Sequence, residues 1–513
     1  MPAGCVNLID CSLRDGHQSL LATRMSLEQS LRVLPLLRDS GYSILELWGG
    51  AVLDSSLRFT GDDPFERLET LRRVLDEAGR EIEIRSLCRG QNLFGYNPYP
   101  DNVVYEFLKE AIRTGGGKLH RMRIFDALND HRNLTTAIMA TKTFNGHAEA
   151  ALSYTVSPVH DTDHFLGFAQ RVVDAGADSL AIKDMAGLLH PADAWELVER
   201  IKAGFPHLEL TLHAHCTNGL ATASYVVGML AGVDHLDVCH GPMAHGTAQP
   251  PAELMGYFAK ELGIELNVSF EHAPAIDREL RKVREELASV DKDPEHFGNP
   301  WPAEPTAAMV DVMRKAIALL KKRDRASCDE AVDLIEQKIM EPQGYPAIDK
   351  AQLASQIPGG MISNLHNQLK EQGKLDAMPQ ILEEIPRVRA AAGYLPLVTP
   401  TSQIVGTQAA FNVIQGEPYG FVSEPFRDVM LGKYGKLPGP ADPEVLKKVA
   451  EGRELFTGRP AQYVPRVDLA KVFAEHGELI KSHRDLLLML LFPAPAKAFL
   501  KKRAEAARET VGA

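Results

Sequence analysis

The stretch Ser179-Leu180-Ala181-Ile182-Lys183-Asp184-Met185-Ala186-Gly187 joins a short apolar run to two charged residues and ends in a glycine. This pattern is typical of a buried strand, and Lys183 would lie at the strand's carboxyl end. Similar runs recur through the first half of the chain, and they start roughly 25 to 40 residues apart. The predicted strands are Val6–Ile9, Ser43–Leu47, Ile82–Leu87, Met122–Phe125, Ala150–Tyr154, Ser179–Ile182, Leu208–Leu212 and His235–Val238.

Helical patterns separate these runs. Glu28–Leu37 and Asp163–Ala175 are examples, and the second precedes the turn Gly176-Ala177-Asp178. Eight strands that alternate with eight helices over about 270 residues indicate an α/β fold, the (β/α)8 or TIM barrel. A doubly wound parallel sheet is the alternative. It is less favoured because polar motifs follow nearly every strand, not just those at one switch point.

The strand rhythm stops near residue 300. The segment Gly298-Asn299-Pro300-Trp301-Pro302 predicts a boundary, because Gly and Pro interrupt regular elements. We therefore expect a barrel over residues 1–300, a mainly helical domain over residues 301–460 that closes over the barrel mouth, and a helical tail over residues 461–513. Helices are expected at Thr306–Lys322, Asn364–Gln372, Ile381–Ala391, Gln403–Val413 and Pro443–Glu451, and a basic helix at Lys497–Arg508.

Composition excludes several classes of protein. The chain has 513 residues, 45% of them hydrophobic, and a formal net charge of −12 without a Lys/Arg cluster, which argues against a nucleic-acid partner. Its 6 Cys form no CxxC pair, so a reducing compartment is expected. No signal peptide is evident at the N-terminus, and the apolar run Leu486–Phe492 is too short to span a bilayer. A cytoplasmic location is therefore predicted.

Four side chains that follow predicted strands are candidates for a metal site on the barrel's C-terminal rim. Asp15 follows the first strand, and His213 and His215 lie two residues apart, so both imidazoles face the same side of a strand. Alone, each has an ordinary explanation: a loop-capping Asp, a common HxH pair and, for Lys183, a rim ion pair. Together the four residues predict a site for Zn2+, Co2+ or Mn2+.

Lys183 restricts the chemistry of such a site. A free ammonium is a cation without a lone pair, so it cannot be a metal ligand. Lys183 must therefore stay away from the metal or be carbamylated by CO2, which converts it into an anionic oxygen ligand. The carbamylated form would indicate carboxyl-group chemistry.

At these positions the chain resembles the biotin-dependent carboxyltransferases that act on pyruvate and oxaloacetate. That family includes the carboxyltransferase subunit of transcarboxylase, the α chain of oxaloacetate decarboxylase and the corresponding part of pyruvate carboxylase. The resemblance covers nearly the whole chain in order. The motifs that carry it are Arg14–Arg24, Glu46–Ala51, Leu87–Asn92, Arg123–Asp130, Ser157–His160, Lys183–Gly187, Ile357–Asn364 and Pro396–Gly406.

The resemblance implies a role for each candidate residue. Asp15, carbamylated Lys183, His213 and His215 would hold the metal. Arg89 would pair with the substrate carboxylate, since its planar guanidinium matches a carboxylate with two parallel hydrogen bonds. Gln18 and Tyr96 would lie beside the keto acid, and Ser363 would carry a proton. Arg14 and Asp184 would support the ligands, although for both a plain rim ion pair is an equally good explanation.

The resemblance also implies cofactors and partners. The substrate would be pyruvate or oxaloacetate, and biotin would be supplied on a separate carrier protein, because the sequence has no Met-Lys-Met biotinylation segment. Further carboxylase, transcarboxylase or decarboxylase subunits and a homodimer are expected. Two residues depart from the family pattern, Cys216 after the HxH pair and His245 in the loop after the last strand.

Two other functions remain as alternatives. A carbon–carbon lyase or Claisen-type synthase acting on an acyl-CoA can share Arg-Asp-Gly and HxH on a related barrel. Such families resemble only the barrel, and they lack the Lys of the sixth strand and the Pro-Gly-Gly segment, both of which are present here. A non-catalytic scaffold would leave the whole ligand set unexplained.

Overall fold

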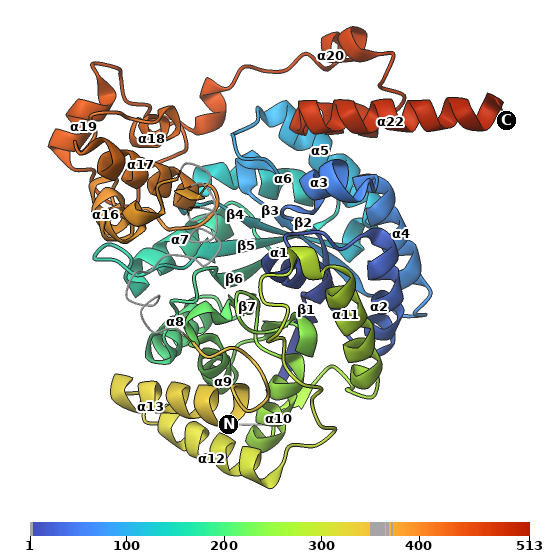
Figure 1. The fold of residues 1–513 in the computed structure, drawn as a ribbon, viewed down its shortest axis with the longest axis vertical. Helices are drawn as coiled ribbons and strands as arrows, with labels where there is room; N and C mark the ends of the chain where they lie inside the picture. Colours follow the sequence, from blue (N-terminus) through green and yellow to red (C-terminus); the bar gives the residue numbers. More distant parts are fainter. Residues whose placement is uncertain (1–3, 349–364, 366–368, 371–372, 513) are drawn as a thin grey trace.

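Eight parallel strands close into a barrel (Figure 1). The computed structural model describes residues 4–348, 365, 369–370 and 373–512. The strands are β1 (Cys5–Asp10), β2 (Ile44–Gly49), β3 (Glu83–Cys88), β4 (His120–Phe125), β5 (His147–Ser153), β6 (Ser179–Asp184), β7 (Glu209–Ala214) and β8 (His235–Val238). Each pairs with the next, and β1 pairs with both β8 and β2, where Asp10 faces Leu45. The predicted TIM barrel is confirmed, and the doubly wound sheet is wrong because the sheet has closed.

Helices follow the strands and cover the outside of the barrel. They are α2 (Leu27–Asp39), α4 (Pro64–Asp76), α5 (Asp101–Thr114), α6 (Thr135–Thr143), α7 (Thr162–Asp174), α8 (Pro191–Gly204), α9 (Ala221–Ala231) and α10 (Ala252–Leu262). Short helices α1 (His17–Leu20) and α3 (Val52–Ser55) precede α2 and α4, and α11 (Ala273–Glu286) follows the two-residue strand β9 (Glu265–Leu266). Helix α2 begins at a capping box, in which Ser26 accepts a hydrogen bond from the backbone N–H of Gln29.

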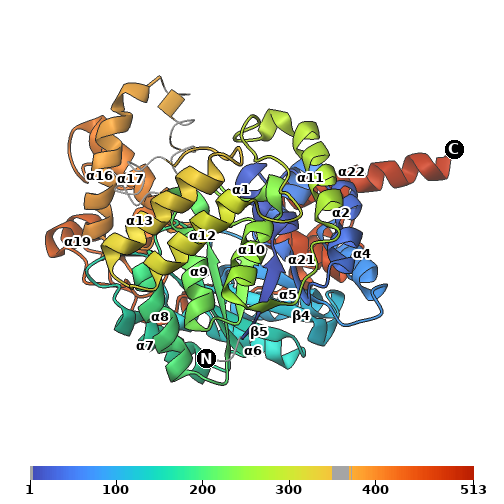
Figure 2. The same cartoon turned by 90° about the horizontal axis from the view of Figure 1, so that it is seen from below.

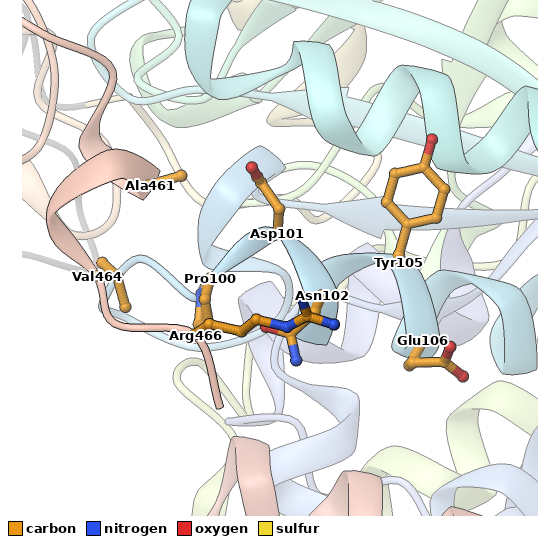
Figure 3. A pocket seen from close by; sticks show the side chains of 8 residues that line it. All are labelled: Pro100, Asp101, Asn102, Tyr105, Glu106, Ala461, Val464 and Arg466. Atoms are coloured by element: carbon orange, nitrogen blue, oxygen red, sulfur yellow. The ribbon is translucent and has the colours of Figure 1, made fainter. Parts of the chain in front are cut away.

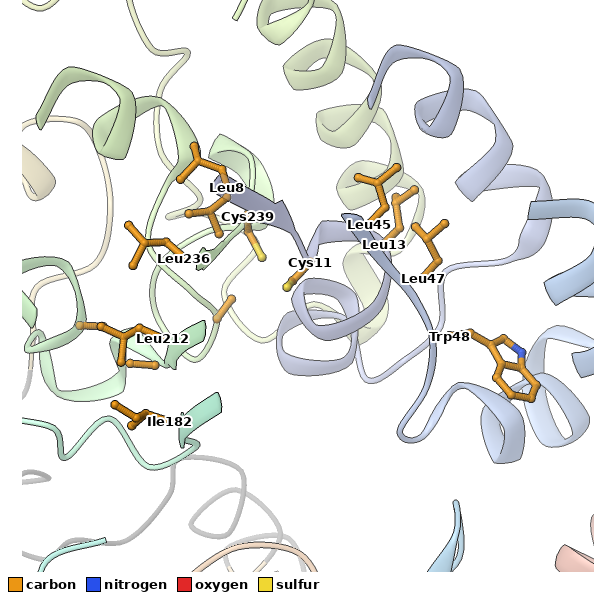
Figure 4. Close-up of a cluster of buried hydrophobic side chains, with 14 of the residues drawn as sticks. Leu8, Cys11, Leu13, Leu45, Leu47, Trp48, Ile182, Leu212, Leu236 and Cys239 are labelled. Atoms are coloured by element: carbon orange, nitrogen blue, oxygen red, sulfur yellow. The ribbon is translucent and has the colours of Figure 1, made fainter. Parts of the chain in front are cut away.

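The apolar core lies between the strands and their helices. Figure 4 shows part of it, where Leu8, Leu45, Leu212 and Leu236 come from β1, β2, β7 and β8. Each of these side chains is fully buried. Apolar burial outside the sheet therefore attaches the helices, as the alternation of strand and helix patterns predicts.

The inside of the barrel is charged instead. Arg14, Glu46, Arg85, Arg123, Glu149 and Asp237 form what we call the barrel ion network, and each of these side chains is 0% exposed. Arg85 lies 2.8 Å from a Glu46 oxygen and 2.7 Å from an Asp237 oxygen, and Arg123 lies 2.7 Å from Glu149 and also contacts Asp237. TIM barrels are commonly filled by Val, Ile and Leu, so this interior is unusual.

The remainder of the chain is helical. Its elements are α12 (Ala307–Leu320), α13 (Arg325–Ile335), α16 (Met378–Ala391), α17 (Thr401–Gln415), α18 (Glu424–Met430), α19 (Pro443–Ala450), α20 (Leu469–His476), α21 (His483–Leu491) and α22 (Pro493–Gly512). Helices α12 and α13 pack on each other and against α9 and α10 (Figure 2). Helices α16 to α19 enclose a second apolar cluster, which Leu128 of the β4–α6 loop joins.

The tail returns to the barrel through α21 and α22. Arg484 of α21 lies 2.7 Å from Glu110 of α5, and the end of α22 extends beyond the barrel in both views (Figures 1 and 2). The predicted helices overlap α12, α16, α17, α19 and α22, whereas Asn364–Gln372 falls largely outside the described residues. The division at residues 300 and 460 stays a prediction. Among the described helices, none has the length and apolarity that crossing a bilayer requires.

The barrel ion network yields a stability prediction. Replacing Glu149 by Ala leaves Arg123 buried with one carboxylate partner fewer, and breaking a buried pair in this way costs about 3–5 kcal/mol. Glu149→Ala should therefore lower the free energy of unfolding by that amount in denaturant titrations. The control is Glu81→Ala, which removes a surface ion pair with Lys118 whose side chains are 68% and 65% exposed. The control should cost less than about 1 kcal/mol, and equal losses in the two variants would contradict the prediction.

Candidate active site

The carboxyl ends of β1, β6 and β7 place four predicted ligands together. Lys183 and His213 are register neighbours on β6 and β7, and His215 directly follows β7. Asp15 lies in the turn η1 (Ser12–Gly16) that follows β1. All four residues are buried, with Lys183 1% and His213 0% exposed.

Three atoms that carry lone pairs converge at this point. Asp15 Oδ2 lies 3.2 Å from His213 Nε2 and 3.4 Å from His215 Nε2, and the two nitrogens are 3.2 Å apart. Two ligands bound tetrahedrally at about 2.1 Å from one ion are about 3.4 Å apart, so the donor set fits a divalent metal. Asp15, His213 and His215 are thus the residues of this site that could hold one.

The outer nitrogens of both imidazoles have fixed partners. His213 Nδ1 donates to Asp237 Oδ2 at 2.7 Å, and His215 Nδ1 donates to the Thr247 carbonyl oxygen at 2.6 Å. Because these oxygens only accept, each Nδ1 carries the hydrogen and each Nε2 presents its lone pair to the site. Asp237 belongs to the barrel ion network, so the network orients His213.

The Asp15 carboxylate is also held from two sides. Arg14 Nη1 lies 3.0 Å from Asp15 Oδ1, and Gln249 Nε2 donates to Oδ2 at 3.0 Å. The charge of Arg14 and the contacts with both imidazoles hold the pKa of Asp15 well below its usual range, although burial opposes them. Asp15 therefore stays ionised, as a ligand must be.

Lys183 reaches the same point from β6. Its Nζ lies 2.9 Å from His213 Nε2. Burial lowers the pKa of Lys183 to about 8, with the charge of Asp15 acting in the opposite direction. A neutral amine is the form that can attack CO2, and the lowered pKa makes that form accessible near neutral pH. The geometry is therefore compatible with the carbamylated ligand expected from the sequence.

The two predicted supporting residues differ in how they meet the ligands. Arg14 bridges Asp15 and Glu46, with its Nε 2.6 Å from Glu46 Oε1. Asp184 acts through its backbone, because its carbonyl oxygen accepts the His215 N–H at 3.0 Å. Its carboxylate accepts the Leu189 N–H at 2.7 Å, and burial raises the pKa of Asp184 to about 6.

The predicted substrate residues lie in neighbouring loops. Arg89, at the end of β3, is 8% exposed, and its guanidinium is 5.6 Å from the ring of Tyr96. Within the part of the chain that the structure describes, only its Nη1 is hydrogen-bonded, to the Phe94 and Gly95 carbonyl oxygens. Gln18 Oε1 accepts a hydrogen bond from the Ala51 N–H at 2.9 Å. Gln18 Oε1 and Arg14 Nη1 both lie beside Gly50. Ser363 lies outside the described residues.

Loops of the helical part meet the barrel near Arg89. Arg89 lines a narrow cavity with Phe125, Asp126, Tyr434 and the segment Thr399-Pro400-Thr401. Arg389 of α16 donates to Thr155 Oγ1 at 2.9 Å and to the Val156 carbonyl oxygen. The helical part thus contacts the loops after β4 and β5, on the same side of the barrel as the ligands.

A larger cavity of about 510 Å³ lies elsewhere, between α5 and residues 461–466 (Figure 3). Asp101, Tyr105, Glu106 and Arg466 line it. None of its lining residues is among the predicted site residues. This cavity is therefore separate from the cluster of proposed metal ligands.

Sequence patterns missed three further residues that orient the proposed ligands. Asp237, Thr247 and Gln249 were not predicted, although each contacts a ligand. A signal was present for Asp237, because a carboxylate in the middle of an apolar strand needs a partner across the barrel. Thr247 acts through its backbone carbonyl, which leaves no signal in the side chain.

Comparisons with known proteins agree over nearly the whole chain. A family described as "Conserved carboxylase domain" matches residues 353–512, and one described as "HMGL-like" matches residues 122–280. A pyruvate carboxylase subunit of Methanocaldococcus jannaschii is 37% identical over 97% of this chain and 78% of its own. The methylmalonyl-CoA carboxyltransferase 5S subunit of Propionibacterium freudenreichii is 36% identical over 98% of this chain and 88% of its own.

Two further similarities are to proteins whose names or titles include a 2-oxo acid. The 2-oxoglutarate carboxylase large subunit of Hydrogenobacter thermophilus is 33% identical over 97% of this chain and 68% of its own. A solved structure of the carboxyl transferase domain of Rhizobium etli pyruvate carboxylase with pyruvate has a TM-score of 0.77. It is 26% identical over 97% of this chain and 77% of that one.

The ligand cluster predicts a metal that depends on Lys183. The purified protein should contain a divalent transition metal, and Lys183→Ala should weaken metal binding by at least about 10–100-fold, the loss seen when mere supporting residues are removed. Elemental analysis and chelator competition measure both. Lys142→Ala, which removes a surface Lys paired with Asp178, is the matched control and should bind metal normally. A protein without metal whose activity survives chelation would refute the assignment.

Proposed function

Because the chain belongs to the family of biotin-dependent carboxyltransferases, we propose that it transfers a carboxyl group between carboxybiotin on a separate carrier protein and a 2-oxo acid. Pyruvate and oxaloacetate are the proposed pair. The observation that carries the proposal is the convergence of Asp15, Lys183, His213 and His215 at one point of the barrel mouth. Carboxylate and imidazole groups suit a divalent metal, and a carbamylated Lys183 would add an anionic oxygen to them.

Each residue has a proposed task. Asp15, His213, His215 and carbamylated Lys183 would hold a divalent metal, which would act as a Lewis acid on the keto oxygen. Arg89 binds the substrate carboxylate with the guanidinium nitrogens that have no hydrogen bond to a described residue, and Gln18 and Tyr96 lie beside the keto acid. Arg14 and Asp184 hold the positions of Asp15 and His215.

The proposed reaction balances without an oxidant. In the direction of carboxylation, the bond between biotin nitrogen and the carboxyl carbon breaks, and a bond from that carbon to the pyruvate methyl carbon forms. The methyl group loses one proton and the ureido nitrogen gains one. Ser363 is the proposed carrier of this proton, a task for a hydroxyl within reach of both atoms.

The proposed partners follow from the same reaction. Carboxybiotin must enter the barrel mouth on a carrier protein, and further subunits of a carboxylase, transcarboxylase or decarboxylase complex complete the cycle. We propose Zn2+, Co2+ or Mn2+ as the metal, a homodimer as the assembly and the cytoplasm as the location.

Substrate assays test the function directly. The protein with a biotinylated carrier should decarboxylate oxaloacetate, and the carboxylated carrier should convert pyruvate to oxaloacetate. Pyruvate and 2-oxoglutarate should be compared side by side, because relatives carry both substrate names. Cleavage or condensation of an acyl-CoA without biotin would favour the lyase or synthase instead, and transfer only to 2-oxoglutarate would correct the proposed substrate.

Arg89→Lys should raise the KM for pyruvate or oxaloacetate at least about tenfold, because a point charge cannot make the two-pronged contact. The metal content should stay unchanged, since Arg89 touches none of the ligands. Steady-state kinetics on the metal-loaded protein measure the change. Arg466→Lys, in the separate cavity beside α5, is the control. An unaltered KM in Arg89→Lys would remove Arg89 from the substrate site.

A further inference from the structure

His245 and Glu336 form a buried pair at the rim of the barrel. His245, in the loop between β8 and α10, is 0% exposed, and its Nε2 lies 3.0 Å from Glu336 Oε2. Glu336 is 6% exposed and begins η9 (Glu336–Met340), the helical turn that continues α13. The pair therefore connects the helices that follow the barrel to a loop of the barrel itself.

The backbone of His245 is held in an unfavourable conformation. Its φ is +64°, in the left-handed region that glycine adopts freely and that a residue with a Cβ adopts at a cost in free energy. A glycine would fit this turn without that cost. The contact of the imidazole with Glu336 is the interaction that offsets it.

The loop that begins at His245 carries two supports of the ligands. The Thr247 carbonyl oxygen accepts the hydrogen of His215 Nδ1 at 2.6 Å, and Gln249 Nε2 donates to Asp15 at 3.0 Å. The loop is closed on itself, because the His245 N–H donates to the Gln249 carbonyl oxygen at 2.8 Å. A displacement of His245 is therefore transmitted to both supports within four residues.

The segment after α13 contacts the same rim at two more points. The Tyr345 ring lies 5.1 Å from the His245 ring, and the Tyr345 hydroxyl donates to the Gly241 carbonyl oxygen at 2.9 Å. Glu336 Cγ lies 3.3 Å from where a Cβ on Gly219 would stand, in the loop after β7. Glu336 is thus enclosed between the loops that follow β7 and β8.

We propose that His245 and Glu336 are positioning residues of the carboxyltransferase site. Through the loop they hold the Thr247 carbonyl against His215 and the Gln249 amide against Asp15, so that α13 fixes the geometry of two ligands it does not touch. The inference rests on the proposed metal site, whose ligands it concerns.

Cobalt(II) reconstitution tests the inference with a readout other than turnover. Apoprotein variants are loaded with Co2+, and their visible absorption, Co2+ affinity by chelator competition, and kcat and KM for oxaloacetate are measured. Glu336→Ala and His245→Gly should shift the cobalt spectrum and lower kcat with little change in KM. Both variants should also weaken Co2+ binding about tenfold, which is the lower end of the loss caused by removing supporting residues of a metal site. The double variant should lose no more than either single one, because the two residues act as one unit.

The controls separate positioning from folding. Glu336→Gln keeps an acceptor for His245 and should retain a near-wild-type spectrum, whereas Glu336→Ala should not. Asp329→Asn removes another α13 carboxylate that pairs with a rim histidine, His190, and it should change neither spectrum nor kcat. His245→Gly removes the backbone strain at this position, so this variant is expected to fold. It therefore still tests the inference if Glu336→Ala does not fold.

Two results would overturn the inference. Wild-type cobalt spectra and affinities in both Glu336→Ala and His245→Gly would show that the pair has no part in the site. Failure of the wild-type protein to bind Co2+ would instead overturn the proposed metal site, and the inference with it.

Discussion

The barrel ion network joins the strands of the barrel to one another through buried ion pairs. Three guanidinium groups and three carboxylates share an interior closed to water, where an unpaired charge would be strongly destabilising. Each charged group comes from a different strand or strand end, so all can be paired only when the barrel is closed in the correct register. Asp237 then extends the network to His213. The same interactions that close the barrel therefore orient a proposed metal ligand.

The order of strands and helices could be predicted from the sequence because it depends on local patterns. The run Ser179–Ile182 lies within β6, and the predicted Asp163–Ala175 differs from α7 by one residue at each end. Tertiary context decided what these patterns could not. Helix α13, for example, is only 11 residues long and mixes charged with apolar residues, and it is stabilised by Ala331 and Ile335, which are buried in the apolar core that includes the barrel helices.

The proposed ligands and two of their supports, Arg14 and Asp184, could be identified from the sequence, whereas the other supports could not. Asp15, Lys183 and His213 stand at strand ends, and one topological rule brings strand ends together in a parallel barrel. The contacts of Thr247 and Gln249 depend on the path of an irregular loop, which no periodicity encodes. Some of the charges inside β2 to β5 could have been recognised, since Glu46, Arg123 and Glu149 each stand between two apolar residues of a strand.

The pairing inside the barrel also limits how this protein can change over time. A single substitution at Glu46, Arg85 or Arg123 leaves buried partners with one opposite charge fewer, whereas an apolar replacement of the whole set can be neutral or stabilising. Proteins in which only part of the charged set has been replaced by apolar residues are therefore the least stable. Loops at the rim can therefore diverge one residue at a time, but the interior can be exchanged only by several changes made together.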